Sequence, residues 1–319
     1  MKYRKVVLVL GGSGFIGSHV VDCLLSYNFK VINIDLNSRC LNNSNYFESV
    51  LDVLDPNSNV LFVDVLKTYK PAIIFNLIST MSIKKCNDCA SQAVKNNILS
   101  NISILETIKI HNHLYHTSKV DLFVYASSVY AGNNKSGVYG ITKRASEDFI
   151  KYYCGNCDLN YLLLRYGTVY GPRSTEENTI HKIIVAALKT KRISLYGTGE
   201  ETREYVNVKD AANMSVSLIK QSLENDRYLF DAYKISNQTY FIGGSNSINA
   251  SSLASLLKDI LGPEYSIEFR DEKSVGHYNI TPYQYENVPI KYNCDFERDL
   301  GAGLLETINY LTKEKFDEK

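Results

Sequence analysis

Residues 6–17, VVLVLGGSGFIG, join an apolar segment directly to three glycines, Gly11, Gly14 and Gly17. A buried strand that turns sharply into a helix needs residues without a Cβ at the turn, so that the backbone can adopt positive φ and approach a phosphate closely. The spacing is G-x-x-G-x-x-G, not the commoner G-x-G-x-x-G, and a glycine triplet alone also fits an ordinary strand–turn–helix. The stretch predicts a phosphate-binding loop whose ligand depends on the rest of the chain.

The segments that follow alternate between strand and helix patterns. Helices are predicted at 15–27, 88–111 and 138–153, a loop at 37–48, and strands at 30–35, 60–63, 72–78, 120–126 and 160–165. Strands linked by helices form parallel βαβ units. The pattern therefore predicts an α/β fold built on a doubly wound parallel sheet.

The regular alternation breaks at residue 167. We expect a dinucleotide-binding domain over 1–166, joined by return segments at about 205–242, and a smaller C-terminal α/β region for the substrate, formed by 167–204 and 243–319. The last part contains a predicted helix at 248–261, a strand at 265–269, an irregular stretch at 277–294 and a closing helix at 300–311.

The composition of the chain limits the classes of binding partner that we expect. The 319 residues include 35 basic and 34 acidic side chains, a net charge of +1, with no basic tract, so neither nucleic acid nor an anionic membrane is an expected partner. No apolar run is long enough to span a bilayer, and the short one after the basic start ends in the glycine turn instead of a cleavage site. A cytoplasmic protein is expected.

Two groups of residues suggest metal binding. Cys86/Cys89 and Cys154/Cys157 have the C-x-x-C spacing of zinc sites, but the predicted fold places the pairs at opposite edges of the sheet. The histidines at 111, 113 and 116 fit a solvated helix C-terminus, where a positive charge interacts favourably with the negative end of the helix dipole. No metal site is predicted.

Polar and glycine residues gather where the predicted strands end, which is where doubly wound sheets bind ligands. Asp35 ends the second strand, 18 positions after Gly17. A carboxylate there accepts hydrogen bonds from an adenosine ribose and repels a 2′-phosphate, which favours NAD over NADP. Other strand ends carry Asp64, residues 77–80, residues 127–128 and residues 166–169.

The catalytic candidate is the segment from Tyr139 to Lys143. Positions i and i+4 share one face of a helix, so the phenol and the ammonium can address the same point. A nearby lysine favours the tyrosinate and is expected to lower the pKa of Tyr139, which makes it a usable general base. Ser128, at the end of the neighbouring strand, is placed to hydrogen-bond the reacting oxygen.

These residues together resemble the extended short-chain dehydrogenase/reductase family, in its NAD-dependent nucleotide-sugar epimerase/dehydratase branch with a Rossmann fold. The matching segments are GGSGFIG (11–17), Asp35, Asp64-Val65, Asn97, VYASS (124–128), Tyr139/Lys143, LRYGTVYGPR (164–173) and REYVNVKD (203–210). They span most of the chain in family order, and the last third matches less distinctly.

The resemblance implies a role for each matching residue. Ser128, Tyr139 and Lys143 would be catalytic, with Lys143 also holding the nicotinamide ribose. The implied NAD-binding residues are Gly11, Gly14, Phe15, Ile16, Gly17, Asp35, Asp64, Val65, Leu77, Ile78, Ser79, Asn97, Tyr139, Lys143, Tyr166 and Val169. The implied substrate-binding residues are Thr80, Ser127, Asn178, Tyr196, Arg203 and Arg270. For Arg203, a guanidinium suits phosphate oxygens, although a surface ion pair with a neighbouring glutamate is an alternative.

Three features of the sequence depart from the family pattern. Val129 and Tyr130 stand where dehydratases carry an acid and a base, so elimination of water would lack its proton shuttles. Only eleven positions separate Ser128 from Tyr139, fewer than in typical members, and Gly167 replaces a frequent asparagine. The hydride-transfer residues are intact, so the changes affect the expected substrate and reaction.

The expected function is an NAD-dependent nucleotide-sugar epimerase, acting at sugar C4 through a transient keto-sugar. A nucleotide-sugar reductase, dehydrogenase or dehydratase is the alternative within enzymes, and a non-catalytic NAD-binding sensor or scaffold is the alternative outside them. A homodimer through the helices at 88–111 and 138–153 is implied by the resemblance, because helical periodicity does not distinguish a dimer face from a core face.

Overall fold

The computed structural model describes residues 6–55, 58–132, 137–225, 235–244, 247–270, 289–292 and 298–317. Its main sheet has eight strands in the order β13-β10-β6-β5-β4-β1-β2-β3, and every neighbouring pair is parallel. The strands are β1 (Val6–Leu10), β2 (Lys30–Asp35), β3 (Tyr46–Val50), β4 (Ile73–Asn76), β5 (Leu122–Ser128), β6 (Asn160–Tyr166), β10 (Gln238–Ile242) and β13 (Ile290–Lys291).

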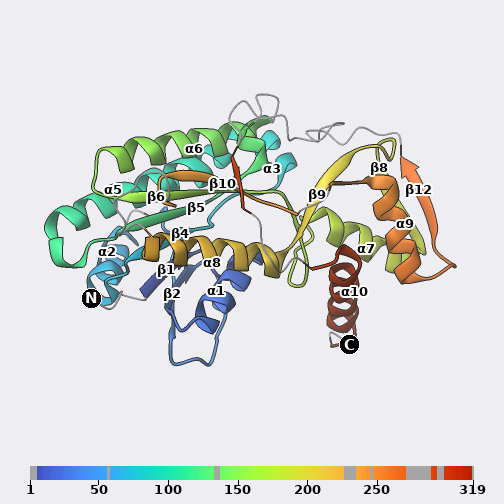
Figure 1. The fold of residues 1–319 in the computed structure, drawn as a ribbon, viewed down its shortest axis with the longest axis horizontal. Helices are drawn as coiled ribbons and strands as arrows, with labels where there is room; N and C mark the ends of the chain where they lie inside the picture. Colours follow the sequence, from blue (N-terminus) through green and yellow to red (C-terminus); the bar gives the residue numbers. More distant parts are fainter. Residues whose placement is uncertain are drawn as a thin grey trace.

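Helices cover both faces of this sheet (Figure 1). They are α1 (Phe15–Ser26) and α8 (Val208–Asn225) on one face, and α2 (Ser58–Tyr69), α5 (Ser100–Leu114) and α6 (Gly137–Gly155) on the other. Alternate residues of β1 point to opposite faces: Val7 and Val9 join the first core, Leu8 and Leu10 the second. A strand buried on both faces is apolar throughout, which explains the unbroken run at 6–10.

The order of the strands indicates which edge of the sheet binds ligands. The chain proceeds outward from β1 through β2 to β3, then crosses to β4, which pairs with β1 on its other side. Ligands bind at such a reversal, beyond the carboxyl ends of the strands. The predicted fold class, a doubly wound parallel α/β sheet, is confirmed, and so are the strands beginning near residues 30, 72, 120 and 160.

The predicted third strand is wrong. Residues 60–63 lie in helix α2, whereas β3 lies partly in the predicted loop and pairs with β2 from Val31↔Tyr46 to Asp35↔Val50. The four apolar residues at 60–63 resemble a strand, but Phe62 and Leu66, one helical turn apart, are the buried ones. Tertiary packing overrode the local β preference.

The predicted helix at 88–111 is interrupted. After α3 (Ile83–Asp88), α4 (Ala90–Val94) runs into one turn of π-helix at Lys95–Leu99, which continues as α5. Such π-turns occur mostly at functional sites. Here the π-turn carries the buried side chain of Asn97.

A second region extends from the sheet, on the right in Figure 1. Its core is built from α7 (Thr179–Thr190), α9 (Ala250–Leu261) and α10 (Leu300–Asp317). Two small sheets belong to it: β7 (Thr168–Tyr170), β9 (Thr202–Asn207) and β11 (Ser247–Asn249) form one, and β8 (Arg192–Tyr196) and β12 (Ser266–Arg270) form the other. The helices predicted at 248–261 and 300–311 and the strand at 265–269 are confirmed within a few residues.

Within the predicted return segments at about 205–242, α8 and β10 lie on the main sheet, and only β9 at the start does not. β9 pairs with β7 and β11, whereas α8 packs on α1 and β10 joins the edge of β6. Of the predicted irregular stretch at 277–294, only residues 289–292 lie within the described residues. The exact domain boundaries stay a prediction.

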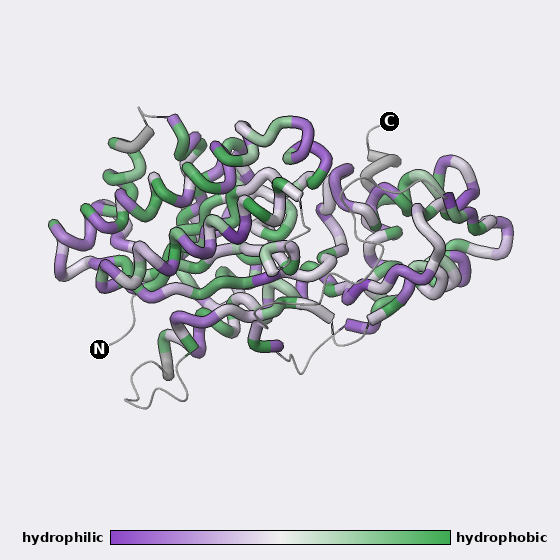
Figure 2. The backbone as a smooth tube through the Cα atoms, turned by 90° about the horizontal axis from the view of Figure 1, so that it is seen from above, coloured by the Kyte–Doolittle hydropathy of each residue, from purple (hydrophilic) through white to green (hydrophobic). Residues whose placement is uncertain are grey.

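Hydropathy follows this arrangement, with apolar residues concentrated in the central strands and alternating with polar ones along the outer helices (Figure 2). Within the described ranges, no helix is long and apolar enough to cross a bilayer.

The cysteine and histidine groups occupy ordinary packing positions. Cys86 is buried beside Tyr139, and Cys154 is buried in the core beneath α6. His111 is 2% exposed, and its Nε2 lies 3.1 Å from the Ser118 carbonyl oxygen. It is therefore not at a solvated helix end, contrary to the prediction.

Candidate active site

The glycine loop connects β1 to α1 and is tightly packed. Gly11 has φ +84° and donates its N–H to the Ile34 carbonyl at 2.8 Å. A Cβ added to Gly17 would lie 2.1 Å from the Gly11 carbonyl oxygen, inside any allowed contact. Glycine at both positions is therefore a requirement of the turn itself.

The start of α1 fits a pyrophosphate. Gly14 is the N-cap residue, and no side chain caps the helix. A Cβ added to Gly14 would meet only the Gly11 carbonyl oxygen, at 3.4 Å, so a ligand can approach the backbone there. Uncapped N–H groups at a helix N-terminus attract anions. The next residues, Phe15 and Ile16, form the first turn of α1, and the loop as a whole fits the phosphates of NAD.

Two β2 side chains hold the loop from behind. Asp35 Oδ2 accepts from the Ser13 N–H at 2.9 Å, and Asn33 Oδ1 accepts from the Gly12 N–H at 3.0 Å. Asp35 remains partly exposed at the end of its strand, where a ribose would lie, whereas Asn33 is buried. Sequence reasoning missed Asn33, although a polar residue within the apolar run of β2 was a usable signal.

Asp35→Asn is expected to weaken NAD binding by about 10- to 100-fold, because hydrogen bonds to a charged group contribute about 1.5–3 kcal/mol. The preference for NAD over NADP should shrink as well, since the repulsion of a 2′-phosphate is lost. Titration calorimetry with both dinucleotides measures the two effects. Asp158→Asn, which removes the same charge from a side chain that is 90% exposed, is the control and should change neither affinity.

The loop after β4 closes the other side of the glycine turn. A Cβ on Gly11 would meet the Ile78 nitrogen and the Leu77 carbonyl carbon, each at 3.2 Å. Asn97 holds the next two residues: its Oδ1 accepts from the Ser79 hydroxyl at 3.1 Å and the Thr80 N–H at 2.7 Å. Asn97 therefore supports the loop that carries Ser79 and Thr80.

Asn97 also ties this loop to the catalytic helix, because its Nδ2 donates to the Thr142 hydroxyl at 3.0 Å. The side chain is fully buried, with both ends of its amide engaged. Its effect on a bound cofactor is thus exerted through the residues it positions.

The expected adenine residues do not lie at a strand end. Asp64 and Val65 are in the second turn of α2, and Asp64 is exposed. The residues that follow β3 are instead Asp52, exposed, and Val53, buried. The chain contains the pair Asp-Val twice, and the copy near a strand end is Asp52-Val53, whereas Asp64-Val65 lies in a helix.

The three catalytic candidates meet where β5 faces α6. Tyr139 and Ser128 are near enough for Ser128 to lower the pKa of the Tyr139 phenol, and both side chains are largely buried. Lys143, one turn further along α6, donates to the Ala126 carbonyl at 2.7 Å, and its Nζ lies 5.9 Å from the centre of the Tyr139 ring. The structure thus brings together the serine, tyrosine and lysine that the sequence predicted.

The charge states differ from the prediction. Burial raises the pKa of Tyr139 above its ordinary value, and the hydrogen bond with Ser128 opposes this only in part. Burial also lowers the pKa of Lys143 to about 7, partly offset by the Glu147 carboxylate. The predicted lowering of the Tyr139 pKa by Lys143 is therefore wrong for the chain itself, because desolvation by burial outweighs the lowering effect of Ser128.

The Lys143 ammonium predicts a stability that depends on pH. The folded-state pKa of about 7 lies below the ordinary 10.5, so the unfolded chain binds more protons between these values. The free energy of unfolding should therefore rise with pH above about 7, by at most about 1.4 kcal/mol per pH unit. Urea unfolding at pH 7, 8 and 9 measures the slope. Lys143→Met should abolish the rise, and an equal slope in that variant would contradict the assignment.

Ser127 is not placed to bind a substrate. Its hydroxyl donates to Glu147 Oε1 at 2.5 Å within the core, so the prediction for Ser127 is wrong. Successive strand residues point to opposite sides, and only Ser128 faces Tyr139. Glu147 is also paired with Arg165 of β6 at 2.7 Å, and both side chains are buried. Sequence reasoning missed this pair, whose signal is a glutamate four positions after Lys143.

The ring of a second tyrosine packs against Tyr139, whose hydroxyl is the candidate reacting group. The rings of Tyr130 and Tyr139 meet edge to face with 6.0 Å between their centres. Arg203 on β9 acts electrostatically on Tyr130 and on Tyr205, lowering the pKa of each, although burial raises both pKa values overall. The Arg203 guanidinium thus lies on the side of the site where the phosphates of a nucleotide sugar are expected.

The other expected substrate residues divide into two groups. Tyr196 and Arg270 are neighbours in register at the ends of β8 and β12, and both are exposed. Asn178 instead caps α7: its Oδ1 accepts from the Ile180 and His181 N–H groups, and its Nδ2 donates to the Val169 carbonyl. Asn178 therefore shapes the start of α7, and one hydrogen of its amide nitrogen is not used by these bonds, so its contact with a phosphate stays a prediction.

The expected nicotinamide residues, Tyr166 and Val169, are both buried beyond β5, at the end of β6 and in β7. The Tyr166 hydroxyl is 2.6 Å from the Ser215 hydroxyl of α8, so that side chain packs between layers. Any contact with a cofactor there comes from the backbone that follows the strand.

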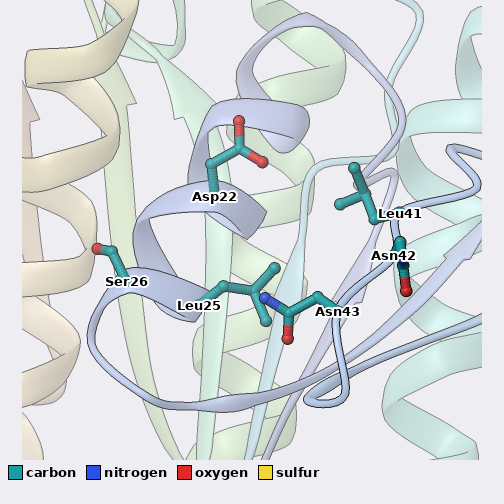
Figure 3. Close-up of a pocket in the computed structure, with 6 residues that line it drawn as sticks. All are labelled: Asp22, Leu25, Ser26, Leu41, Asn42 and Asn43. Carbon is teal, nitrogen blue, oxygen red and sulfur yellow. The ribbon is translucent and has the colours of Figure 1, made fainter.

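A separate pocket lies between α1 and the loop after β2 (Figure 3). None of the predicted site residues lines it; the lining residues are Asp22, Leu25, Ser26, Leu41, Asn42 and Asn43.

Comparison with known proteins agrees with this geometry. A family model described as the NAD dependent epimerase/dehydratase family matches residues 7–230. A putative UDP-glucose 4-epimerase of Methanocaldococcus jannaschii is 29% identical over 233 residues, which cover 66% of this chain and 72% of that protein. A probable dTDP-glucose 4,6-dehydratase of Sinorhizobium fredii is 25% identical, covering 82% of this chain and 78% of that protein.

Among solved structures, a UDP-glucose 4-epimerase of Thermotoga maritima with UDP-glucose superimposes with a TM-score of 0.77. The alignment covers 97% of this chain and 99% of that chain, at 23% sequence identity. This likeness shows that the fold is shared along the whole length.

Proposed function

This chain belongs to the NAD dependent epimerase/dehydratase family, and from that premise we propose that it is a nucleotide-sugar epimerase acting at C4 of the sugar. The observation that carries the proposal is the grouping of Ser128, Tyr139 and Lys143 at the end of β5, the sheet edge shared with the glycine loop. A phenol and a hydroxyl at one point suit the removal and return of a single alcohol proton.

The side chains divide the work. Ser128 holds the hydroxyl at the reacting carbon, and Tyr139 takes its proton and later returns it. NAD, when bound, supplies a reversible acceptor for the hydride of the same carbon. Lys143 holds the nicotinamide ribose, and its positive charge favours the tyrosinate form of Tyr139 during proton transfer. Rotation of the keto-sugar before the return of the hydride inverts C4.

Epimerisation needs no further acid or base, which favours it over dehydration. The positions where dehydratases carry an acid and a base hold Val129 and Tyr130. Val129 has no titratable group, and burial raises the pKa of Tyr130 above its ordinary value. Elimination of water would therefore lack a proton donor and acceptor of the usual kind.

The substrate class follows from Arg203 and from the named relatives. A guanidinium binds phosphate oxygens with two parallel hydrogen bonds, which suits the pyrophosphate of a nucleotide sugar. The relatives named above are described as acting on UDP-glucose and dTDP-glucose. UDP-hexoses are accordingly the first substrates to test, with dTDP-glucose beside them.

The test is incubation of the purified protein with each nucleotide sugar, followed by chromatography and mass spectrometry. An epimerase converts the sugar with no change of mass and without consumption of NAD. A loss of water indicates a dehydratase, and a change of two hydrogens with consumption of the dinucleotide indicates a reductase or dehydrogenase. Bound NAD without conversion of any sugar would favour a sensor or scaffold.

We also propose a homodimer through α5 and α6. Their outer faces carry exposed apolar side chains at helical spacing: Ile110 and Leu114 on α5, and Ile141, Phe149 and Tyr152 on α6. The two helices lie side by side (Figure 1). Exposed apolar side chains gathered on neighbouring helices are typical of an interface.

Light scattering after size exclusion is expected to give twice the chain mass of 36.1 kDa. Ile110→Asp should shift the mass towards a single chain, because a buried unpaired charge is costly at an interface. Val60→Asp on α2, where the side chain is 66% exposed, is the matched control and should leave the mass unchanged. A single-chain mass for the natural sequence would refute the dimer.

A further inference from the structure

Two hydrogen bonds join the end of β5 to α6. The Ala126 carbonyl accepts from Lys143 Nζ at 2.7 Å, and the Ser127 hydroxyl donates to Glu147 Oε1 at 2.5 Å. The next strand residue, Ser128, interacts with the catalytic tyrosine. Three consecutive strand residues thus meet three helix residues spaced one turn apart, and the turn that carries Glu147 lies outside the catalytic motif.

That third turn carries a buried ion pair. Glu147 is 1% exposed; its Oε1 also accepts from Arg165 Nε at 2.9 Å and its Oε2 from Arg165 Nη2 at 2.7 Å. Burying two charges costs several kcal/mol per ion, and an apolar pair of similar size often holds such elements equally well. The packing of α6 on the sheet therefore does not by itself explain a charged pair here.

The pair lies next to the catalytic lysine. The groups that face Lys143 are the Tyr125 ring of β5 at 4.8 Å, the Tyr139 ring, the Cys86 thiol of α3 and the Glu147 carboxylate one turn further along α6. Of these, Glu147 is the one that forms an ion pair, with Arg165, and it opposes the lowering of the Lys143 pKa more than the Cys86 thiol does.

We propose that Glu147 is a positioning residue of the catalytic site: held by Arg165 and Ser127, its carboxylate fixes the catalytic face of α6 on the end of β5, one helical turn from Lys143. The bidentate geometry fixes the carboxylate, so its charge stays at one place relative to Lys143. The inference rests on the proposed function only through the role of Lys143.

The test is the titration of Lys143 in the folded chain. NMR of protein labelled with 13C at the lysine Cε gives one signal per lysine, and Lys143→Met identifies the signal of interest. In Glu147→Gln, the midpoint of that signal should fall by about one pH unit or more, because a unit charge one helical turn away is removed from a poorly solvated site. An unchanged midpoint in a folded variant overturns the proposal.

A second variant covers the case in which Glu147→Gln does not fold, since Arg165 would then be buried without its partner. Glu147→Leu combined with Arg165→Met removes both charges and keeps similar volumes, and the same downward shift is expected. The matched control is Asp210→Asn, which breaks the ion pair of another fully buried carboxylate, with the exposed Arg298, away from Lys143. It should lower stability and leave the Lys143 midpoint in place.

The pH profile of turnover gives the second readout. The pH range in which the enzyme is active should move in the same direction as the Lys143 midpoint in the Glu147 variants, whereas a merely structural role would lower turnover equally at every pH. A profile of unchanged shape in a folded variant also overturns the proposal. If the proposed function is wrong, the natural protein shows no turnover, but the Lys143 titration is unaffected because it needs no sugar. Failure of the proposed function can therefore be distinguished from failure of this proposal.

Discussion

Phenylalanine in place of Tyr139 is expected to lower turnover by about 10²- to 10⁴-fold, the usual contribution of a positioned general acid–base group. The hydroxyl is the only part removed, and it is the group that bonds Ser128. The ring remains packed against Tyr130, so the variant should fold with unchanged stability to within about 1 kcal/mol.

The informative measurement combines turnover with NAD affinity. Stopped-flow or steady-state assays should show the loss in kcat, and titration calorimetry should show nearly unchanged binding of NAD. Tyr27→Phe, which removes a hydroxyl from a side chain at the end of α1 that is 39% exposed, is the matched control and should retain full turnover. If Tyr139→Phe kept its turnover, the assignment of the general base would be wrong.

Alanine at Gly17 is expected to abolish NAD binding and to destabilise the fold. The added Cβ would lie 2.1 Å from the Gly11 carbonyl oxygen, and neither position can yield because both belong to the backbone of the turn. Overpacking of this kind costs about 1–3 kcal/mol or more. The affinity for NAD should fall by at least about 100-fold, as the N–H groups that meet the phosphates are displaced.

Two other glycines separate the causes. Gly14→Ala adds a methyl group that meets only the Gly11 carbonyl oxygen at 3.4 Å, so stability should be retained while the approach of a phosphate is obstructed. Gly155→Ala, at the end of α6, has no atom within 4 Å of its added Cβ and should change neither property. Thermal unfolding and calorimetry on the three variants distinguish strain in the turn from loss of the ligand. Equal NAD affinity in all three would refute the phosphate loop.

Local patterns were sufficient where the function depends on neighbouring positions in the chain. The glycine turn, Asp35 at the end of β2 and the i, i+4 pair of Tyr139 and Lys143 are each set by short-range geometry, and the structure places them as expected. The alternation of strands and helices likewise indicated the parallel sheet, because a crossover is needed between parallel neighbours.

The third strand shows where local patterns failed. The apolar residues at 60–63 favour a strand, yet they form a helix, and β3 is an edge strand that pairs, among the strands the structure describes, with β2 alone. The preference of a short segment is weak compared with packing on the sheet. The assignment of Asp64 and Val65 depended on that strand, so the error passed from the fold to the site.

The sequence by itself determined the parallel fold, the phosphate turn and the catalytic pair, because these follow from backbone sterics and helical spacing. Only the tertiary structure decided that Ser128 and not Ser127 faces Tyr139, that Asn178 caps a helix, and that Glu147 is paired with Arg165. The physical reason is that the direction and charge state of a side chain depend on burial and on partners distant in the chain, and neither is written in its immediate neighbours.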